Sequence, residues 1–79
     1  MESVELRIVA QGDQVSTPWI WRLSREFEVK VFLMRAQVDL DFGRYLIKLE
    51  GAVEEIQRAT SWLMTTGMFV EASKRKLGV

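Results

Sequence analysis

Residues 28–51 of the chain read EVKVFLMRAQVDLDFGRYLIKLEG, and this stretch decides the fold. Core-type apolar side chains fall at every second position over residues 29–34 and again over residues 45–50. A period of two is typical of a β-strand with one buried face. The stretch therefore predicts a β-hairpin that reverses tightly at residues 41–44, where Gly43 supplies the positive φ of the turn.

Strand and helix patterns lie on both sides of this hairpin. Before it, residues 4–10 alternate like a strand, and a helix is expected over residues 18–27, because Thr17 before Pro18 is typical of a helix start. After it, residues 52–66 carry apolar side chains at helical spacing, and residues 68–72 alternate again. The element order is therefore βαββαβ.

Right-handed crossovers then fix how the four strands are arranged. They place the third strand beside the first and leave the second and fourth strands at the edges. The prediction is an α+β, ferredoxin-like fold with a four-stranded antiparallel sheet, order 4-1-3-2, and two helices on one face. Residues 1–73 are expected to form this single domain and residues 74–79 a basic flexible tail. The second face of the sheet has no cover within the chain.

The composition excludes several classes of function. The 79 residues contain no cysteine and no histidine, which removes disulfides, thiolate metal sites and the usual general base. Eleven basic residues balance eleven acidic ones, so no overall field attracts nucleic acid or an anionic membrane. No apolar stretch approaches the ~20 residues that span a bilayer. We expect a cytoplasmic protein with no cofactor, no metal and no membrane partner.

An ordered set of residues runs through almost the whole chain, from about Val4 to Ala72. Its members are Leu6, Ile8, Gly12, Pro18, Trp19, Ile20, Phe27, Val29, Leu33, Ala36, Gln37, Asp39, Phe42, Gly43, Arg44, Leu46, Leu49, Gly51, Trp62, Leu63, Val70 and Glu71. This set resembles the NIL domain, the small regulatory module at the C-terminus of methionine-importer ATPases. That domain is also found alone or beside ferredoxin modules.

The resemblance implies a domain that is not catalytic, senses methionine or a related amino acid, and pairs with a second copy of itself. A transporter or a ferredoxin module is the implied protein partner. The ligand-binding residues that it implies are Gly12, Pro18, Trp19, Val31, Phe32 and Gly43. Family members commonly carry polar residues, often asparagine, in the stretch aligned with residues 30–32. Here Val31 and Phe32 cannot supply side-chain hydrogen bonds.

The start of the first helix is a candidate site for a carboxylate. Free amides at residues 18–20 combine with the helix dipole to favour an anion. The alternative is that the hydroxyl groups of Ser16 and Thr17 cap these amides, as at most helix starts.

The uncovered sheet face is the candidate interface. If the alternation holds, it carries an apolar patch made of Phe32, Met34, Leu46 and Phe69. The alternative is that a strand bulge returns some of them to the core. Trp21 either anchors a partner as a partly exposed indole or folds down over the Pro18 end of the helix.

Two other functions were weighed against this one. An RRM-like RNA-binding module would use Phe32 and Phe69 on the open face, but the chain lacks the RNP1 pattern and a net positive charge. Asp39 and Asp41 form a close carboxylate pair in water, with no group nearby to act with them. The sequence Asp41-Phe42-Gly43 has no kinase context around it. We therefore predict no enzyme, and an RRM-like RNA-binding module that uses the open sheet face stays the alternative to the regulatory domain.

Overall fold

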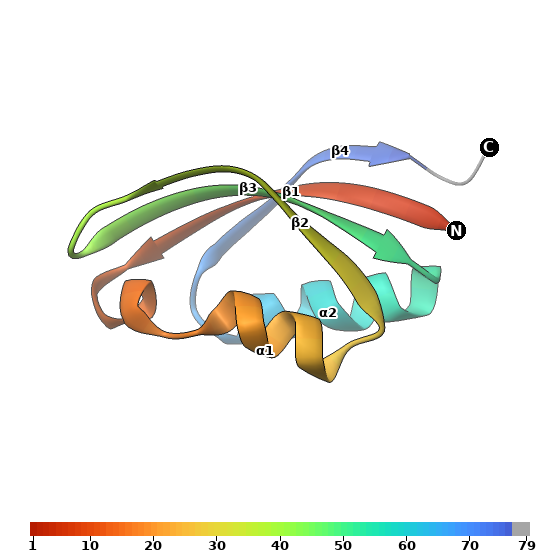
Figure 1. The fold of residues 1–79 in the computed structure, drawn as a ribbon, viewed down its shortest axis with the longest axis horizontal. Helices are drawn as coiled ribbons and strands as arrows, with labels where there is room; N and C mark the ends of the chain where they lie inside the picture. Colours follow the sequence, from red (N-terminus) through yellow and green to blue (C-terminus); the bar gives the residue numbers. More distant parts are fainter. Residues whose placement is uncertain (77–79) are drawn as a thin grey trace.

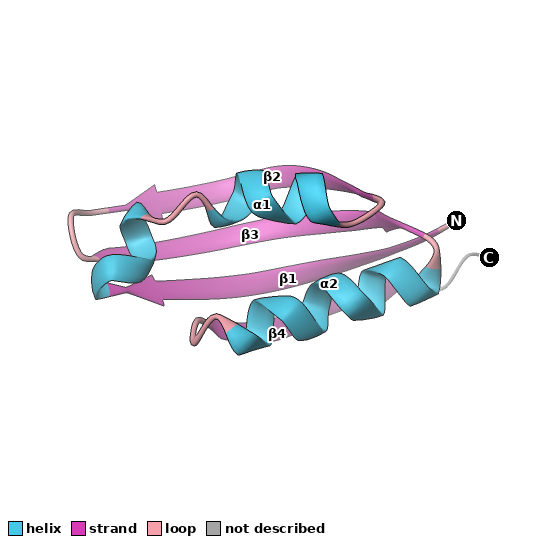
Figure 2. Cartoon of the chain, turned by 90° about the horizontal axis from the view of Figure 1, so that it is seen from below, coloured by secondary structure: helices cyan, strands magenta, loops and turns pink. Residues whose placement is uncertain are grey.

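The chain folds as one antiparallel sheet with both helices on the same face. The computed structural model describes residues 1–76. Its elements are β1 (Glu2–Gln11), the 3₁₀ helix η1 (Gly12–Ser16), α1 (Trp19–Glu26), β2 (Val29–Val38), β3 (Phe42–Gly51), α2 (Val53–Thr65) and β4 (Phe69–Lys76). The sheet order is β2-β3-β1-β4, which confirms the predicted ferredoxin-like topology. Figure 1 shows the sheet above and the helices below, and in Figure 2 α1 lies over β2 and β3 while α2 lies over β1 and β4.

The core lies between the sheet and the helices, and it follows the alternation of the central strands. β1 and β3 bury every second side chain, and α2 buries Ile56, Ala59 and Leu63 along one stripe. The fully buried large side chains are Leu6, Ile8, Leu23, Ile47, Leu49 and Leu63. These positions agree with the pattern of the sequence, since each strand of the pair has one face on the helices.

The hairpin reverses earlier than predicted. β2 ends at Val38 and β3 begins at Phe42, and the backbone N–H of Asp39 donates to the carbonyl oxygen of Phe42 at 2.7 Å. Gly43 lies inside β3 and does not have a positive φ, so its predicted turn role is wrong. A Cβ atom at Gly43 would lie 2.6 Å from the Tyr45 hydroxyl oxygen. The glycine therefore makes room for the Tyr45 ring.

A β-bulge in β2 changes the phase of that strand. Leu33 lies opposite Ile47 and Arg35 lies opposite Leu46, so Met34 is one residue too many. Simple alternation from Val29 onward would turn Arg35 towards the helices. Because of the bulge, Arg35 lies beside Leu46 on the open face instead. Met34 is not returned to the core, since half of its surface stays exposed.

β4 is longer than predicted. It extends to Lys76, with Lys74 opposite Glu5 and Lys76 opposite Ser3 on β1. The prediction of a flexible tail from residue 74 is therefore wrong for residues 74–76, because their backbone pairs with β1 as the last part of β4. Residues 77–79 of the predicted tail lie outside the described residues.

Glu55 ties the start of the hairpin to α2. Its carboxylate accepts a hydrogen bond from the backbone N–H of Glu28 at 2.9 Å and pairs with the Arg58 guanidinium at 2.6 Å. The Glu28 N–H first, and Arg58 second, lower the pKa of Glu55 from its ordinary value of 4.5. The ionised carboxylate is thus favoured by the folded state.

The stability of the domain should therefore depend on this carboxylate in acid. Because the folded-state pKa is the lower one, the contribution is present above pH 4.5 and is lost as pH falls through the folded pKa. We expect Glu55→Gln to lower the melting temperature at neutral pH and to flatten its fall between neutral and acidic pH. Thermal melts across this range test the prediction, with Glu54→Gln, on the exposed neighbour, as the matched control. Parallel pH profiles for the wild type and Glu55→Gln would refute it.

Candidate functional site

The predicted ligand-binding residues fall into two separate groups. Gly12, Pro18, Trp19 and Gly43 belong to the end of the sheet where β1 finishes and β3 begins. Val31 and Phe32 lie opposite Leu49 and Lys48, whereas Gly43 lies opposite Val38. Lys48 is five positions along β3 from Gly43, which is roughly 17 Å at the usual rise of a strand. One copy of the chain does not bring the six residues into a single site.

The start of α1 has no side-chain cap. Pro18 occupies the N-cap position, so α1 begins at Trp19, one residue after the predicted start at Pro18. The hydroxyl groups of Ser16 and Thr17 donate instead to the carbonyl oxygens of Asp13 and Gln14 in η1. The alternative that these two hydroxyls cap α1 is therefore wrong. The first amides of the helix are left without a side-chain acceptor.

The loop that precedes α1 is held against the hairpin turn. Gly12 has a φ of 61°, a left-handed conformation that glycine adopts without strain. Its backbone N–H donates to the carbonyl oxygen of Asp41 at 2.9 Å. This bond brings η1 and the turn after β2 together at the same end of the molecule, as Figure 1 also shows.

Trp19 and Gly43 are buried, and both lie against Tyr45. Trp19 is only 3% exposed, and its ring meets the Tyr45 ring edge to face with centroids 5.0 Å apart. Gly43 lies against the same tyrosine ring. Both residues therefore support the end of the sheet from inside and do not face solvent.

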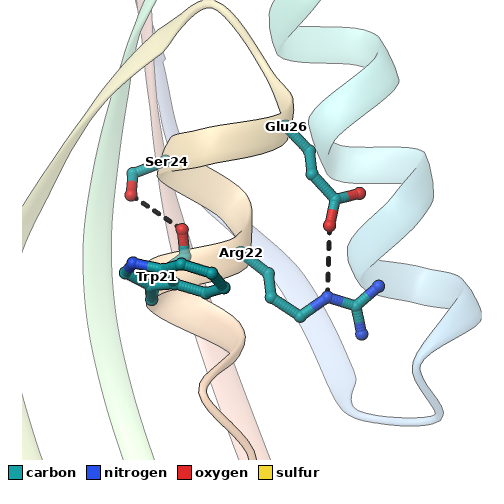
Figure 3. A network of polar contacts seen from close by, with 4 residues as sticks. All are labelled: Trp21, Arg22, Ser24 and Glu26. Carbon is teal, nitrogen blue, oxygen red and sulfur yellow. Dashed lines mark hydrogen bonds and ion pairs between the residues drawn. The ribbon is translucent and has the colours of Figure 1, made fainter.

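Trp21 is the exposed tryptophan of α1. It is 57% exposed, and the Arg25 guanidinium lies 5.0 Å from the centre of its ring. Figure 3 shows Arg22 and Glu26 on the side of α1 that faces α2, whereas the Trp21 ring does not lie on that side. Arg22 pairs with Glu26 at 3.2 Å, and Ser24 donates its hydroxyl to the Trp21 carbonyl oxygen at 2.9 Å. Trp21 thus points away from α2 and does not fold into the core.

The free edge of β2 exposes apolar side chains on both faces of the sheet. Phe32 lies on the open face with the Lys48 ammonium 4.7 Å from its ring centre, and 40% of its surface is exposed. Leu33 and Val38 lie opposite buried positions of β3, on the helix side, yet about half of each is exposed. β2 is an edge strand, so one row of its backbone groups has no strand partner. The β2 edge therefore combines unpaired backbone groups with exposed apolar side chains, which favours the addition of another strand.

The open sheet face differs from the predicted apolar patch. Phe32 and Met34 lie at the β2 edge, while Phe69, which is 59% exposed, lies on β4 at the other edge. Arg7, Arg35 and Arg44 lie between them around Leu46, and they line a hollow of about 400 Å³. The patch is therefore split by charge. Arg44 alternates with the buried Tyr45, so its direction was readable in the sequence, whereas Arg35 reaches this face only through the bulge.

The acidic side chains of the described residues do not gather into a metal-ligating cluster. Within residues 1–76 no group of three metal-ligating side chains comes together. Asp39 and Asp41 both lie in the exposed turn between β2 and β3. No described helix has the length and apolar character to cross a membrane.

The chain is similar to several known proteins. The model of the NIL domain family matches residues 5–72. The methionine import ATP-binding protein MetN of Helicobacter pylori is 33% identical over 72 residues, which cover 86% of this chain and 22% of that protein. The chain thus spans about a fifth of the length of this relative.

Two solved structures share the fold at lower sequence identity. One is the C-terminal domain of an ABC transporter ATP-binding protein from Enterococcus faecalis, with a TM-score of 0.80 at 21% identity, covering 92% of this chain and 86% of that one. The other is the de novo designed protein Foldit4, with a TM-score of 0.65 at 18% identity, covering 99% and 98%. At such identities the likeness shows the fold alone.

Proposed function

Since the chain belongs to the NIL domain family, we propose that it is a non-catalytic regulatory domain that pairs with a second copy of itself and binds methionine or a related small amino-acid-like ligand. The match covers residues 5–72, and therefore almost the whole sheet and both helices. The observation that carries the pairing half is the two-sided apolar edge of β2. A chain of 79 residues has a small core, and covering this edge would add to it.

The regulated process in this proposal is transport of an amino acid such as methionine. The Helicobacter pylori relative is named as a methionine import ATP-binding protein, and the Enterococcus faecalis domain comes from an ABC transporter ATP-binding protein. An ATP-binding subunit works where ATP is available, so we place the chain in the cytoplasm. Its protein partner would be a transporter, or a ferredoxin module where the domain stands beside one.

Edge-to-edge pairing through β2 accounts for more of the exposed surface than face-to-face stacking does. Addition of a second β2 would satisfy the unpaired backbone groups and cover Phe32 and Met34 on one face with Leu33 and Val38 on the other. Trp21, on the flank of α1 away from α2, would extend the helix-side part of this contact. Stacking of the open faces would leave Leu33 and Val38 exposed. Stacking would also bring the arginines of the open face of one copy against those of the other copy, and these like charges repel each other.

The ligand half of the proposal uses the start of α1. Its uncapped amides can receive a carboxylate, and a Cβ atom at Gly12, at the start of the preceding η1, would meet nothing within 4 Å. Phe32 lies opposite Lys48, roughly 17 Å along the sheet from Gly43, and would serve pairing and not this site. Trp19 and Gly43 would shape the site from inside by holding Tyr45.

Light scattering after size exclusion tests the pairing half. We expect a mass of about twice the 9.2 kDa chain, because the β2 edge favours association. A monomer at high protein concentration would rule the pairing out.

Thermal shift against the amino acids tests the ligand half. Methionine or a related amino acid at millimolar concentration should raise the melting temperature, because a ligand of the folded state stabilises it by mass action. Methioninamide, which has the side chain and the amine but no carboxylate, should raise it much less. If no amino acid stabilises the chain, the proposal that it binds an amino acid is wrong. The proposal that it pairs with a second copy is tested separately by light scattering.

A further inference from the structure

The hollow on the open sheet face has the chemistry of an anion site with an aromatic neighbour. We propose that it binds a nucleoside phosphate, with the phosphate groups held by Arg7, Arg35 and Arg44 and the base resting on Phe69. This inference is independent of methionine binding and of pairing through β2. It rests on the register of the four strands and on the residues that line the hollow.

Two adjacent rows of side chains build the hollow across the sheet. The first row runs from β4 to β2 as Phe69, Val9, Arg44 and Gln37. The second row runs in the same direction as Glu71, Arg7, Leu46 and Arg35. Arg44 is therefore the diagonal neighbour of Arg7, at about 7–8 Å by usual sheet geometry. Arg35 is also diagonal to Arg44, on its other side. The three long side chains surround Leu46 and can reach one polyanionic group.

The charges of the hollow are not balanced within the described side chains. Glu71 is the one acidic residue among its lining residues, and it faces Arg7 across β1 and β4. None of the ion pairs found in the described part of the chain includes Arg7, Arg35 or Arg44. Arg44 lies with its guanidinium 5.8 Å from the centre of the Phe42 ring. Three guanidinium groups on one small surface repel each other, so a bound phosphate would relieve that repulsion.

Phe69, at the β4 side of the hollow, would favour a ligand that carries a flat base as well as phosphate groups. Phe69 is separated from Arg44 by Val9 alone, that is, by two strand spacings or about 10 Å. Its ring is more than half exposed and offers a face for a flat base. A nucleoside di- or triphosphate has the matching order of groups. Its base would rest on Phe69, its ribose would lie over Val9, and its phosphates would reach the arginines. The volume of about 400 Å³ lies within the range of small-molecule sites.

The neighbouring rows favour a small molecule over a nucleic-acid strand. Beyond the second row, Glu5 lies beside Lys48, and Glu50 pairs with Lys48 at 3.2 Å. Among the side chains of residues 1–72, Glu5 and Glu50 therefore interrupt the basic charge beyond the hollow, which disfavours a track for successive phosphates. The whole chain also carries no net charge. A second copy is disfavoured as well, because two-fold stacking would bring three arginines from each copy together.

Titration of the 79-residue chain with ADP, monitored through backbone amide resonances, tests the site. We expect Val9, Arg44, Leu46 and Phe69 to shift, and ADP to bind more tightly than inorganic phosphate or adenosine. Arg35→Gln and Arg44→Gln should each weaken ADP about tenfold, since each removes a charged hydrogen bond. Phe69→Ala should weaken ADP about tenfold while leaving the affinity for phosphate unchanged.

The matched control is Lys30→Gln, which makes the same change of charge on the same face but outside the hollow. It should leave the ADP affinity unchanged, and all variants should keep the wild-type melting temperature because the altered residues are exposed. Equal ADP affinity in wild type, Arg35→Gln and Arg44→Gln overturns the site. Phosphate binding as tight as ADP overturns the role of Phe69. Tighter binding of an eight-nucleotide RNA than of ADP overturns the small ligand in favour of a single-stranded nucleic acid.

Discussion

A Leu33→Lys variant is expected to be monomeric at concentrations where the wild-type chain is a dimer. Leu33 is about half exposed on the helix side of the β2 edge, so lysine can be accommodated in the monomer. In a two-fold dimer the substitution removes the same contact twice. Full burial of a leucine is worth about 1.5–3 kcal/mol, and about half of each Leu33 remains to be buried on pairing, so the loss for two copies is roughly 1.5–3 kcal/mol, or at least about tenfold in Kd. Light scattering on the two proteins at equal concentration measures it.

A pair of variants distinguishes edge pairing from stacking of the open faces. Phe32→Asp alters the open-face side of the same edge and should also give a monomer. Met64→Lys is the control, because Met64 is similarly exposed but lies on α2. Dissociation by Phe32→Asp with an intact Leu33→Lys dimer would contradict the edge contact and point to stacking.

Gly43→Ala is expected to destabilise the fold although it adds a single methyl group. The new Cβ would lie 2.6 Å from the Tyr45 hydroxyl oxygen and 2.9 Å from two ring carbons. The ring cannot move away freely, because Tyr45 is buried and Trp19 packs against its ring with centroids 5.0 Å apart. Overpacking of this kind costs about 1–3 kcal/mol. For a domain of this size we expect a fall of roughly 5–20 °C in melting temperature.

A double-mutant cycle with Tyr45→Phe tests whether the contact with the Tyr45 hydroxyl causes the loss of stability in Gly43→Ala. Removal of the hydroxyl takes away the shortest of the three contacts, so Gly43→Ala should cost less in the Tyr45→Phe background. The difference should be measurable by chemical denaturation of the four proteins. An equal cost in both backgrounds would show that the Tyr45 ring is not the obstacle.

The fold was predictable because its central elements each bury one face. β1 and β3 alternate cleanly over Leu6, Ile8, Ile47 and Leu49, all of which are almost fully buried. α2 shows the helical spacing for the same reason, with Ala59 and Leu63 against the sheet. A period is visible in a sequence when packing imposes it along a whole element. The strand order then follows from the handedness of the crossovers.

Features that depend on single contacts were misread. The sequence predicts that Gly43 is a turn residue. In the structure Gly43 instead leaves room for the ring of Tyr45, two residues further along β3. Thr17 and Pro18 have the composition of a capped helix start, but the Thr17 hydroxyl bonds to the Gln14 carbonyl oxygen and Pro18 is the N-cap itself. Glycine and hydroxyl residues serve several local roles, and the tertiary neighbours choose among them.

The candidate sites were partly visible in the sequence. Exposure of Phe32, Met34 and Phe69 was predicted from alternation and holds in the structure. The arginine cluster was missed because a bulge has no signature in the apolar pattern of an exposed strand. The extra residue at Met34 moves Arg35 to the open face, beside Leu46. The ligand residues implied by the family resemblance were assigned without this geometry, and they lie in two places.

Backbone hydrogen exchange of β2 at low and at high protein concentration is the most direct test of the proposed regulatory dimer. If two copies join through this edge, amides of residues 32–38 that do not bond to β3 should exchange much more slowly at high concentration. The amides of β4, at the opposite edge, should exchange at the same rate at both concentrations. Exchange in β2 that does not change with concentration, or slowing at β4 alone, would contradict the account.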